Sequence, residues 1–182
     1  MLMKDILILI CPLLLILLAA CWCIRTRNDF VAKEIRVEEG LSGIEVALAK
    51  RYDLLTNLLQ VTKGYMAHEK EIFSQIVRLR KGMSVEELNE AKIQIDGFQD
   101  RLFAVVEGYP ELRASDVCMK LMSGIRDAEE HLQASRRLYN TNVTAYNTAI
   151  AVFPASLMAG SRQPKAFFSA DEEQHDPVSM TV

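Results

Sequence analysis

The sequence predicts an all-α protein, an antiparallel bundle of three long helices preceded by an N-terminal transmembrane helix. Residues 6–24 are apolar at 18 of 19 positions and carry no charge. Beyond them, apolar residues recur at intervals of three and four, which is typical of one face of a helix. The sequence contains no alternating run of β-branched residues, which would indicate a strand, and no Asn-Gly pair, which would indicate a hairpin.

The first segment, residues 6–24, is long enough to cross a bilayer, because 19 helical residues span about 28 Å. Trp22 lies near its end, where indole rings favour the membrane interface. Basic residues follow at Arg25, Arg27, Lys33 and Arg36. This bias predicts a single-pass membrane protein with its domain in the cytoplasm. A lipoprotein signal is the alternative, because Leu18-Ala19-Ala20-Cys21 resembles a lipidation box, and it would place the domain on the opposite side.

The first bundle helix carries a long apolar stripe: Leu41, Ile44, Leu48, Tyr52, Leu55, Leu59, Thr62, Met66, Phe73 and Ile76. Gly40 and Gly43 weaken a helix interior, and Ser42 with Glu45 matches a capping box. We therefore expect this helix to begin near Ser42 rather than to continue from residues 6–24. Gly82 is expected to end it, because a helix C-terminus favours glycine.

The second helix is expected to begin at Ser84, which forms a capping box with Glu87. Its stripe comprises Leu88, Ala91, Ile95, Phe98, Leu102, Val105 and Tyr109. Pro110 is expected to stop it, because proline lacks the amide hydrogen that a helix needs. Residues 107–110 then form a tight turn in which Tyr109 is packed. Short connections between long helices favour antiparallel neighbours.

The third helix has a seven-residue repeat: Cys118, Ile125, Leu132, Tyr139, Tyr146 and Phe153. The offset set is Leu121, Ala128, Ser135, Asn142 and Ala149. A sustained heptad predicts packing against nearly parallel or antiparallel partner helices. Pro154 is expected to close this helix. The resulting organisation is a flank at 1–5, the anchor at 6–24, the bundle at 25–160 and a partly ordered tail at 161–182, whose Phe167 and Phe168 could dock on the bundle.

Composition restricts the function further. The chain has 21 Lys and Arg residues against 24 Asp and Glu residues, with no basic block, so we expect no nucleic-acid partner. Three cysteines, Cys11, Cys21 and Cys23, lie in the apolar segment, which leaves Cys118 alone in the domain. A single thiol forms no internal disulfide framework, and Cys118 is expected to be a small core residue.

Three motifs go beyond generic helical patterning. Residues 50–71 read KRYDLLTNLLQVTKGYMAHEKE, residues 104–114 read AVVEGYPELRA, and residues 136–147 read RRLYNTNVTAYN. Together they resemble the LemA family of bacterial membrane-anchored proteins. The resemblance implies a membrane helix followed by a helical bundle, and it carries over no catalytic residue. Thr56 stands where the family has proline, Arg27 where it has tyrosine, and residues 40–45 also depart from its pattern.

No residue pattern predicts catalysis. His68-Glu69 lacks the second histidine of a zincin helix, because Ile72 occupies that position. No nucleophile motif, dinucleotide motif or phosphate loop is present, so we expect neither an enzyme nor a cofactor or metal. A less favoured alternative is a membrane-tethered, metal-dependent hydrolase using His68, Glu69 or Glu107.

The informative polar residues lie on the first and third bundle helices. They are Arg51, Tyr52, Asp53, Asn57, Arg136, Tyr139, Asn140, Tyr146 and Asn147. Polar tips on aromatic bodies suit a bundle seam, where they can bond across to another helix. We expect a polar network that fixes helix register, or alternatively a groove for a partner helix or peptide. The predicted role is a scaffold or interaction protein whose partners are the lipid bilayer, other membrane or envelope proteins and, in one hypothesis, further copies of the chain.

Overall fold

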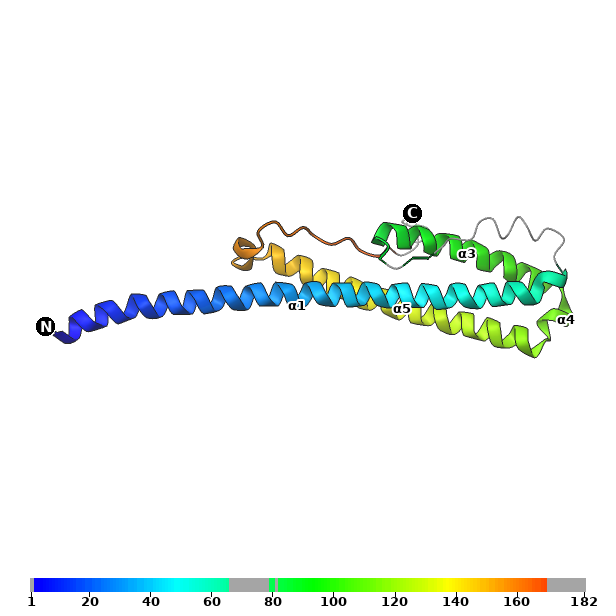
Figure 1. The fold of residues 1–182 in the computed structure, drawn as a ribbon, viewed down its shortest axis with the longest axis horizontal. Coiled ribbons are helices and arrows are strands. Elements are labelled where there is room, and N and C mark those ends of the chain that lie inside the picture. Colours follow the sequence, from blue (N-terminus) through cyan, green and yellow to red (C-terminus); the bar gives the residue numbers. More distant parts are fainter. Residues whose placement is uncertain (1, 66–78, 81, 170–182) are drawn as a thin grey trace, which may run out of the picture. The chain divides into compact units, whose positions relative to one another are not determined.

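The computed structural model describes residues 2–65, 79, 80 and 82–169, and all of its regular elements are helical (Figure 1). The elements are α1 (Leu2–Thr62), the 3-10 turn η1 (Lys63–Tyr65), α3 (Val85–Gly108), α4 (Pro110–Arg113), α5 (Asp116–Ala151) and the 3-10 turn η2 (Ala155–Met158). The described residues include no strand. The all-α class predicted from the sequence is confirmed.

The chain divides into two compact units. One comprises Met1–Glu38 with Thr141–Lys165, and the other comprises Glu39–Asn140 with Ala166–Val182. Helices α1 and α5 each contribute to both units. We describe every contact below within the unit to which it belongs, and we call these the N-terminal unit and the bundle unit.

Helix α1 continues without interruption from Leu2 to Thr62, so the expected start near Ser42 is wrong. Two glycines cost a helix about 1 kcal/mol each relative to alanine. The residues that follow offset this cost, because Ile44, Leu48 and Leu55 are fully buried in the bundle unit. Helix formation therefore continues through Gly40 and Gly43.

The N-terminal segment is part of α1 and contains Pro12. Among the residues that the structure describes, no helix meets the length and apolarity required of a membrane span. The transmembrane helix expected at residues 6–24 is thus unsupported by this finding.

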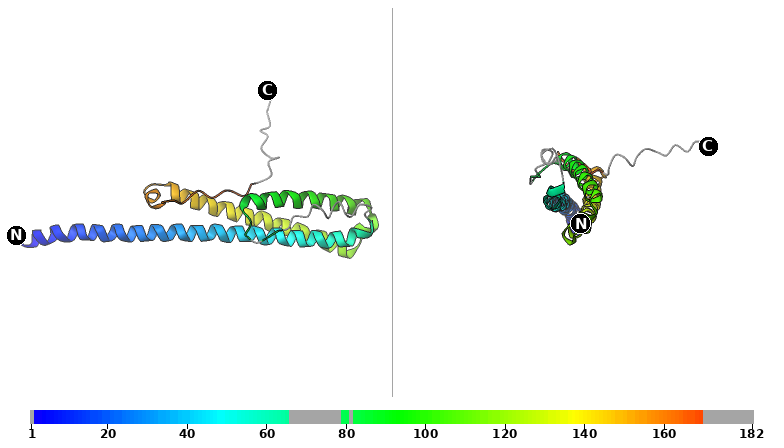
Figure 2. Two further views of the ribbon diagram at one scale, coloured as in Figure 1. Left: turned by 45° about the horizontal axis from the view of Figure 1, so that its top comes forward. Right: turned by 90° about the vertical axis from the view of Figure 1, so that its right-hand side faces the viewer.

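In the bundle unit, α3 runs in the same direction as α1, whereas α5 runs in the opposite direction (Figure 2). Gly82, just before α3, donates its N–H to Glu45 Oε1 of α1 at 3.1 Å. Later in both helices, Gln99 of α3 is bonded to Arg51 of α1. The expected antiparallel pairing of these two helices is therefore wrong. Its basis was a short connection, but α1 ends at Thr62 and α3 begins only at Val85. The antiparallel relation of α5 to α1 holds, because Gly124 faces Leu54 while Gly43 faces Ser135.

The core of the bundle unit is formed largely by the predicted stripes, with Ala47 and Leu58 added on α1 and Val106 in place of the half-buried Val105 on α3. The buried apolar residues of α1 there are Ile44, Ala47, Leu48, Leu55, Leu58 and Leu59. Helix α3 contributes Leu88, Ala91, Ile95, Phe98, Leu102 and Val106, and α5 contributes Cys118, Ile125, Ala128, Leu132 and Tyr139. Burial raises the pKa of the Cys118 thiol, which is consistent with a core residue.

The start of α3 is capped as the sequence predicts. Ser84 Oγ accepts from Glu87 N at 3.2 Å, and Glu87 Oε2 accepts from Ser84 N at 2.8 Å. The hydrogen bond from the Ser84 backbone, together with the nearby Arg80 guanidinium, lowers the pKa of Glu87. Gly82, at φ +80°, occupies the left-handed region that favours glycine.

Two aromatic residues lie outside the core, contrary to expectation. Tyr109 is 43% exposed, because α3 ends at Gly108 and Pro110 starts α4 immediately. Phe153 is 75% exposed, because α5 ends at Ala151 and the heptad spacing has no meaning beyond the helix. The earlier members of this heptad, from Cys118 to Tyr146, are buried as predicted.

Candidate functional site

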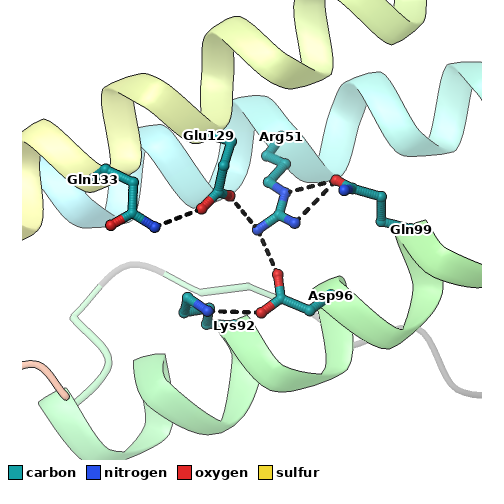
Figure 3. Close-up of polar contacts among 6 residues, drawn as sticks. All are labelled: Arg51, Lys92, Asp96, Gln99, Glu129 and Gln133. Atoms are coloured by element: carbon teal, nitrogen blue, oxygen red, sulfur yellow. Dashed lines mark hydrogen bonds and ion pairs between the residues drawn. The ribbon is translucent and has the colours of Figure 1, made fainter. Parts of the chain in front are cut away.

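A cluster of charged and amide side chains joins the three helices of the bundle unit at Arg51 (Figure 3). Arg51 Nε and Nη2 donate to Gln99 Oε1 at 3.1 and 2.9 Å. Its Nη1 lies 2.6 Å from Asp96 Oδ1 and 2.7 Å from Glu129 Oε2. One guanidinium on α1 therefore contacts both α3 and α5.

Two more side chains extend this Arg51 cluster. Lys92 Nζ donates to Asp96 Oδ2 at 2.7 Å, and Gln133 Nε2 donates to Glu129 Oε1 at 2.7 Å. The two cations, Arg51 and Lys92, balance the two carboxylates. Side-chain exposure is 3% for Arg51 and 5% for Lys92, against 31% for Asp96 and 32% for Glu129. The cations are thus buried while the carboxylates reach solvent.

Such an arrangement is expected to fix helix register more than to add net stability. Arg51 Nη1 and Glu129 Oε2 are buried and make no hydrogen bond, so their contact depends on charge attraction at ion-pair distance. A buried ion pair gains little over apolar packing, because both charges lose hydration. A shift of one helix along its neighbours would leave Arg51 without its carboxylates, and that state is strongly unfavourable.

The sequence pointed to Arg51 but not to its partners. The missed residues Lys92, Asp96 and Gln99 follow directly after Ala91, Ile95 and Phe98 of the apolar stripe. They therefore form a polar row with the same spacing along one edge of the buried face. That row was the signal that could have identified them.

The other polar residues predicted on the first bundle helix do not join the Arg51 cluster. Tyr52 is half-buried, while Asp53 and Asn57 are exposed. Arg136 on α5 is half-buried. The network expected from the sequence is therefore divided into separate sets of contacts.

In the bundle unit, Tyr139 and Asn140 hold the chain that follows η2. Tyr139 Oη donates to Ala166 O at 2.8 Å. Asn140 Nδ2 donates to Phe168 O, and Phe168 N donates to Asn140 Oδ1, both at 3.0 Å. The side-chain amide of Asn140 thus pairs with both the N–H and the C=O of Phe168, as the backbone of a neighbouring strand would. Burial, and secondarily the charge of Glu86, raises the pKa of Tyr139.

The N-terminal unit contains an equivalent arrangement one heptad later. Asn147 Nδ2 donates to Lys165 O at 3.0 Å, and Lys165 N donates to Asn147 Oδ1 at 2.8 Å. Tyr146 is buried, with the Lys165 ammonium 5.9 Å from its ring centre. Tyr139, Asn140 and Asn147 therefore bind backbone of residues 165–168 rather than another helix, whereas the Tyr146 ring faces the Lys165 ammonium.

A groove of about 690 Å³ lies beside the Arg51 cluster in the bundle unit. Its lining comes from α1 and α5 and carries charges of both signs: Lys50, Asp127, Glu129, Glu130, His131, Gln133, Ala134 and Arg137. Mixed charge at this density suits a polar protein surface better than a small apolar ligand.

The residues considered for catalysis are not brought together. His68 and Glu69 lie outside the described residues, while Glu107 is exposed on α3. Within the described ranges, no three His, Cys, Asp or Glu side chains are grouped so as to hold a metal ion. Cys21 is a free, exposed thiol on α1.

Comparison with known proteins agrees with the three motifs. Protein LemA of Metamycoplasma hominis is 27% identical over 138 residues, covering 73% of this chain and 63% of that protein. Magnetosome protein MamQ of Magnetospirillum gryphiswaldense is 26% identical over 162 residues, covering 72% and 60%. The chain thus spans about three fifths of the length of these curated relatives. The model of the LemA family matches residues 40–181, and the chain belongs to this family.

Proposed function

We propose that this chain is a non-enzymatic helical scaffold, anchored in the bacterial cell membrane through residues 6–24. One observation carries the proposal. Leu13, Leu14, Leu15, Ile16, Leu17 and Leu18 are each between 55% and 65% exposed on α1, and Ile24 is 63% exposed. A helix that is apolar on every side requires an apolar environment. Hydrocarbon supplies one, whereas water does not.

The bundle unit supports the scaffold part of the proposal. Its groove beside the Arg51 cluster presents fixed charges of both signs, because α1, α3 and α5 are held in register by that cluster. Such a surface favours another envelope protein, or a second copy of the chain, as its partner. The basic residues that follow the anchor favour a cytoplasmic bundle.

Membrane anchoring predicts a specific response to charge in α1. The full-length chain is expected to stay with the membrane pellet after an alkaline carbonate wash of bacterial cells. A variant with Leu15→Arg and Leu17→Arg is expected to move to the supernatant, because each arginine at the centre of a span costs about 3 kcal/mol.

The matched control is Val31→Arg with Ile35→Arg. These residues are 45% and 49% exposed on the same helix but lie beyond the apolar segment, so the control is expected to remain in the pellet. Recovery of the unaltered chain in the supernatant would contradict the proposal. Cys21→Ser tests the lipoprotein alternative, because only a lipid-attached chain would lose palmitate labelling and membrane retention with that change.

A further inference from the structure

An exposed apolar cluster lies at the turn that follows α5. Val152 is 53% exposed, Phe153 75% and Leu157 74%, all within six residues of one another. Single exposed apolar side chains are common on soluble proteins. A group of exposed apolar side chains that includes an aromatic ring, at a turn where the chain changes direction, indicates a contact surface.

Contacts within the N-terminal unit show which part of α1 lies beside this turn. Asn142 Nδ2 donates to Arg36 O at 2.9 Å. Further along α5, Asn147 is bonded to Lys165, and Lys165 Nζ lies 3.3 Å from Glu34 Oε1 on α1. Helix α5 therefore runs back along α1 toward its N-terminal end. The turn beside that part of α1 can be followed in Figure 1.

The helical rise then places the turn beside the end of the anchor. From Asn142 to Ala151, α5 advances nine residues, or about 14 Å. Arg36 is the residue of α1 that Asn142 contacts. Counting nine residues back along α1 from Arg36 leads to Arg27. The turn at 152–158 continues from that level, and residues 6–24 end three positions before Arg27.

The charge around this turn is suited to anionic lipid headgroups. Residues 131–170 contain no Asp or Glu. Arg162 follows the turn, and Arg25 and Arg27 are exposed on α1 at the same level, whereas Lys165 is already paired with Glu34. Basic residues close to a membrane surface each gain about 1 kcal/mol from anionic lipids.

We propose that the turn at residues 152–158 is a second membrane contact, in which Phe153 and Leu157 insert among the headgroups of an anionic bilayer. This inference rests on the anchoring proposed above. Aromatic and aliphatic side chains gain free energy at the membrane interface by leaving water. Two contacts side by side restrain the rotation of α1 about its own axis.

Fluorescence quenching in proteoliposomes tests this contact. The full-length chain is reconstituted into vesicles of phosphatidylcholine and phosphatidylglycerol whose acyl chains carry bromine near the headgroup. The wild-type protein has one tryptophan, Trp22, which reports on the anchor. A Trp22→Phe, Phe153→Trp variant reports on the turn. A Trp22→Phe, Leu138→Trp variant is the control, because Leu138 is 59% exposed on the same helix, α5.

The proposal predicts a blue-shifted emission and a loss of intensity for tryptophan at position 153, and neither change at position 138. Quenching of Trp22 without quenching at position 153 would overturn the second contact and leave the anchor intact. Quenching at position 153 without quenching of Trp22 would support the contact and overturn the anchor. Equal quenching at positions 153 and 138 would overturn the specific contact. Circular dichroism checks that each variant remains helical.

Discussion

Replacing Arg51 with alanine is expected to lower the free energy of unfolding by about 3 kcal/mol, the lower end of the range for breaking a buried ion pair. The lower end applies because Asp96 and Glu129 are 31% and 32% exposed and regain some hydration. The loss arises because Glu129 is left without its cation, while Asp96 keeps only its ion pair with Lys92. Chemical denaturation of the full-length chain in detergent micelles, followed by circular dichroism, measures it.

Two further variants separate this cause from general damage. Arg126→Ala removes an exposed arginine from α5 and is expected to change stability by less than about 0.5 kcal/mol. Adding Glu129→Gln to Arg51→Ala removes the carboxylate that is left unpaired and is expected to recover part of the loss, because Asp96 keeps its ion pair with Lys92. If Arg51→Ala were as stable as Arg126→Ala, the Arg51 cluster would not hold the three helices in register.

Replacing Phe168 with alanine is expected to cost about 3 to 4 kcal/mol, the usual loss for a large-to-small change at a buried phenylalanine. Phe168 is fully buried, and its backbone is bonded in both directions to Asn140. The side chain therefore completes the core of the bundle unit although it lies far along the chain, after η2. The same denaturation measurement applies.

The neighbouring residue supplies a matched control for Phe168. Phe167 is 52% exposed, so Phe167→Ala is expected to change stability by less than about 0.5 kcal/mol. Equal losses for the two variants would contradict the specific burial of the Phe168 side chain. Equal retention of stability would contradict the packing of this segment against α5.

The sequence predicted those features that depend on one helix at a time. The stripes from Ile44 to Leu59 and from Leu88 to Leu102 are buried as expected except for the half-buried Tyr52, and Ser84 caps α3 with Glu87. Each of these follows from spacing along a single chain segment. Helix existence, core faces and caps could therefore be predicted without a structure.

Relations between helices could not be predicted in this way. The partners of Arg51 lie on α3 and α5, and their selection depends on how far each helix is shifted along its neighbours. The direction of α3 depends on where α1 ends, and no strong stop signal stands at Thr62. The pairing of Asn140 and Asn147 with backbone depends on an extended segment that has no periodic pattern of its own.

The position of Phe153 shows a third limit. Its heptad spacing from Tyr146 predicts burial, but the helix ends two residues earlier, before Pro154. Helix ends are set by local competition between backbone bonding and turn residues, and spacing alone does not locate them. The exposed ring that results is the basis of the second membrane contact.

The central claim is that α1 is one helix with its first part in lipid and its later part in a bundle that faces water. Nitroxide labels at Leu17 and Gln60, in a chain whose native cysteines are replaced, test this claim in proteoliposomes. The label at position 17 is expected to collide with dissolved oxygen and to be shielded from a water-soluble nickel chelate. The label at position 60 is expected to show the reverse. Equal access of the chelate to both labels would contradict the account.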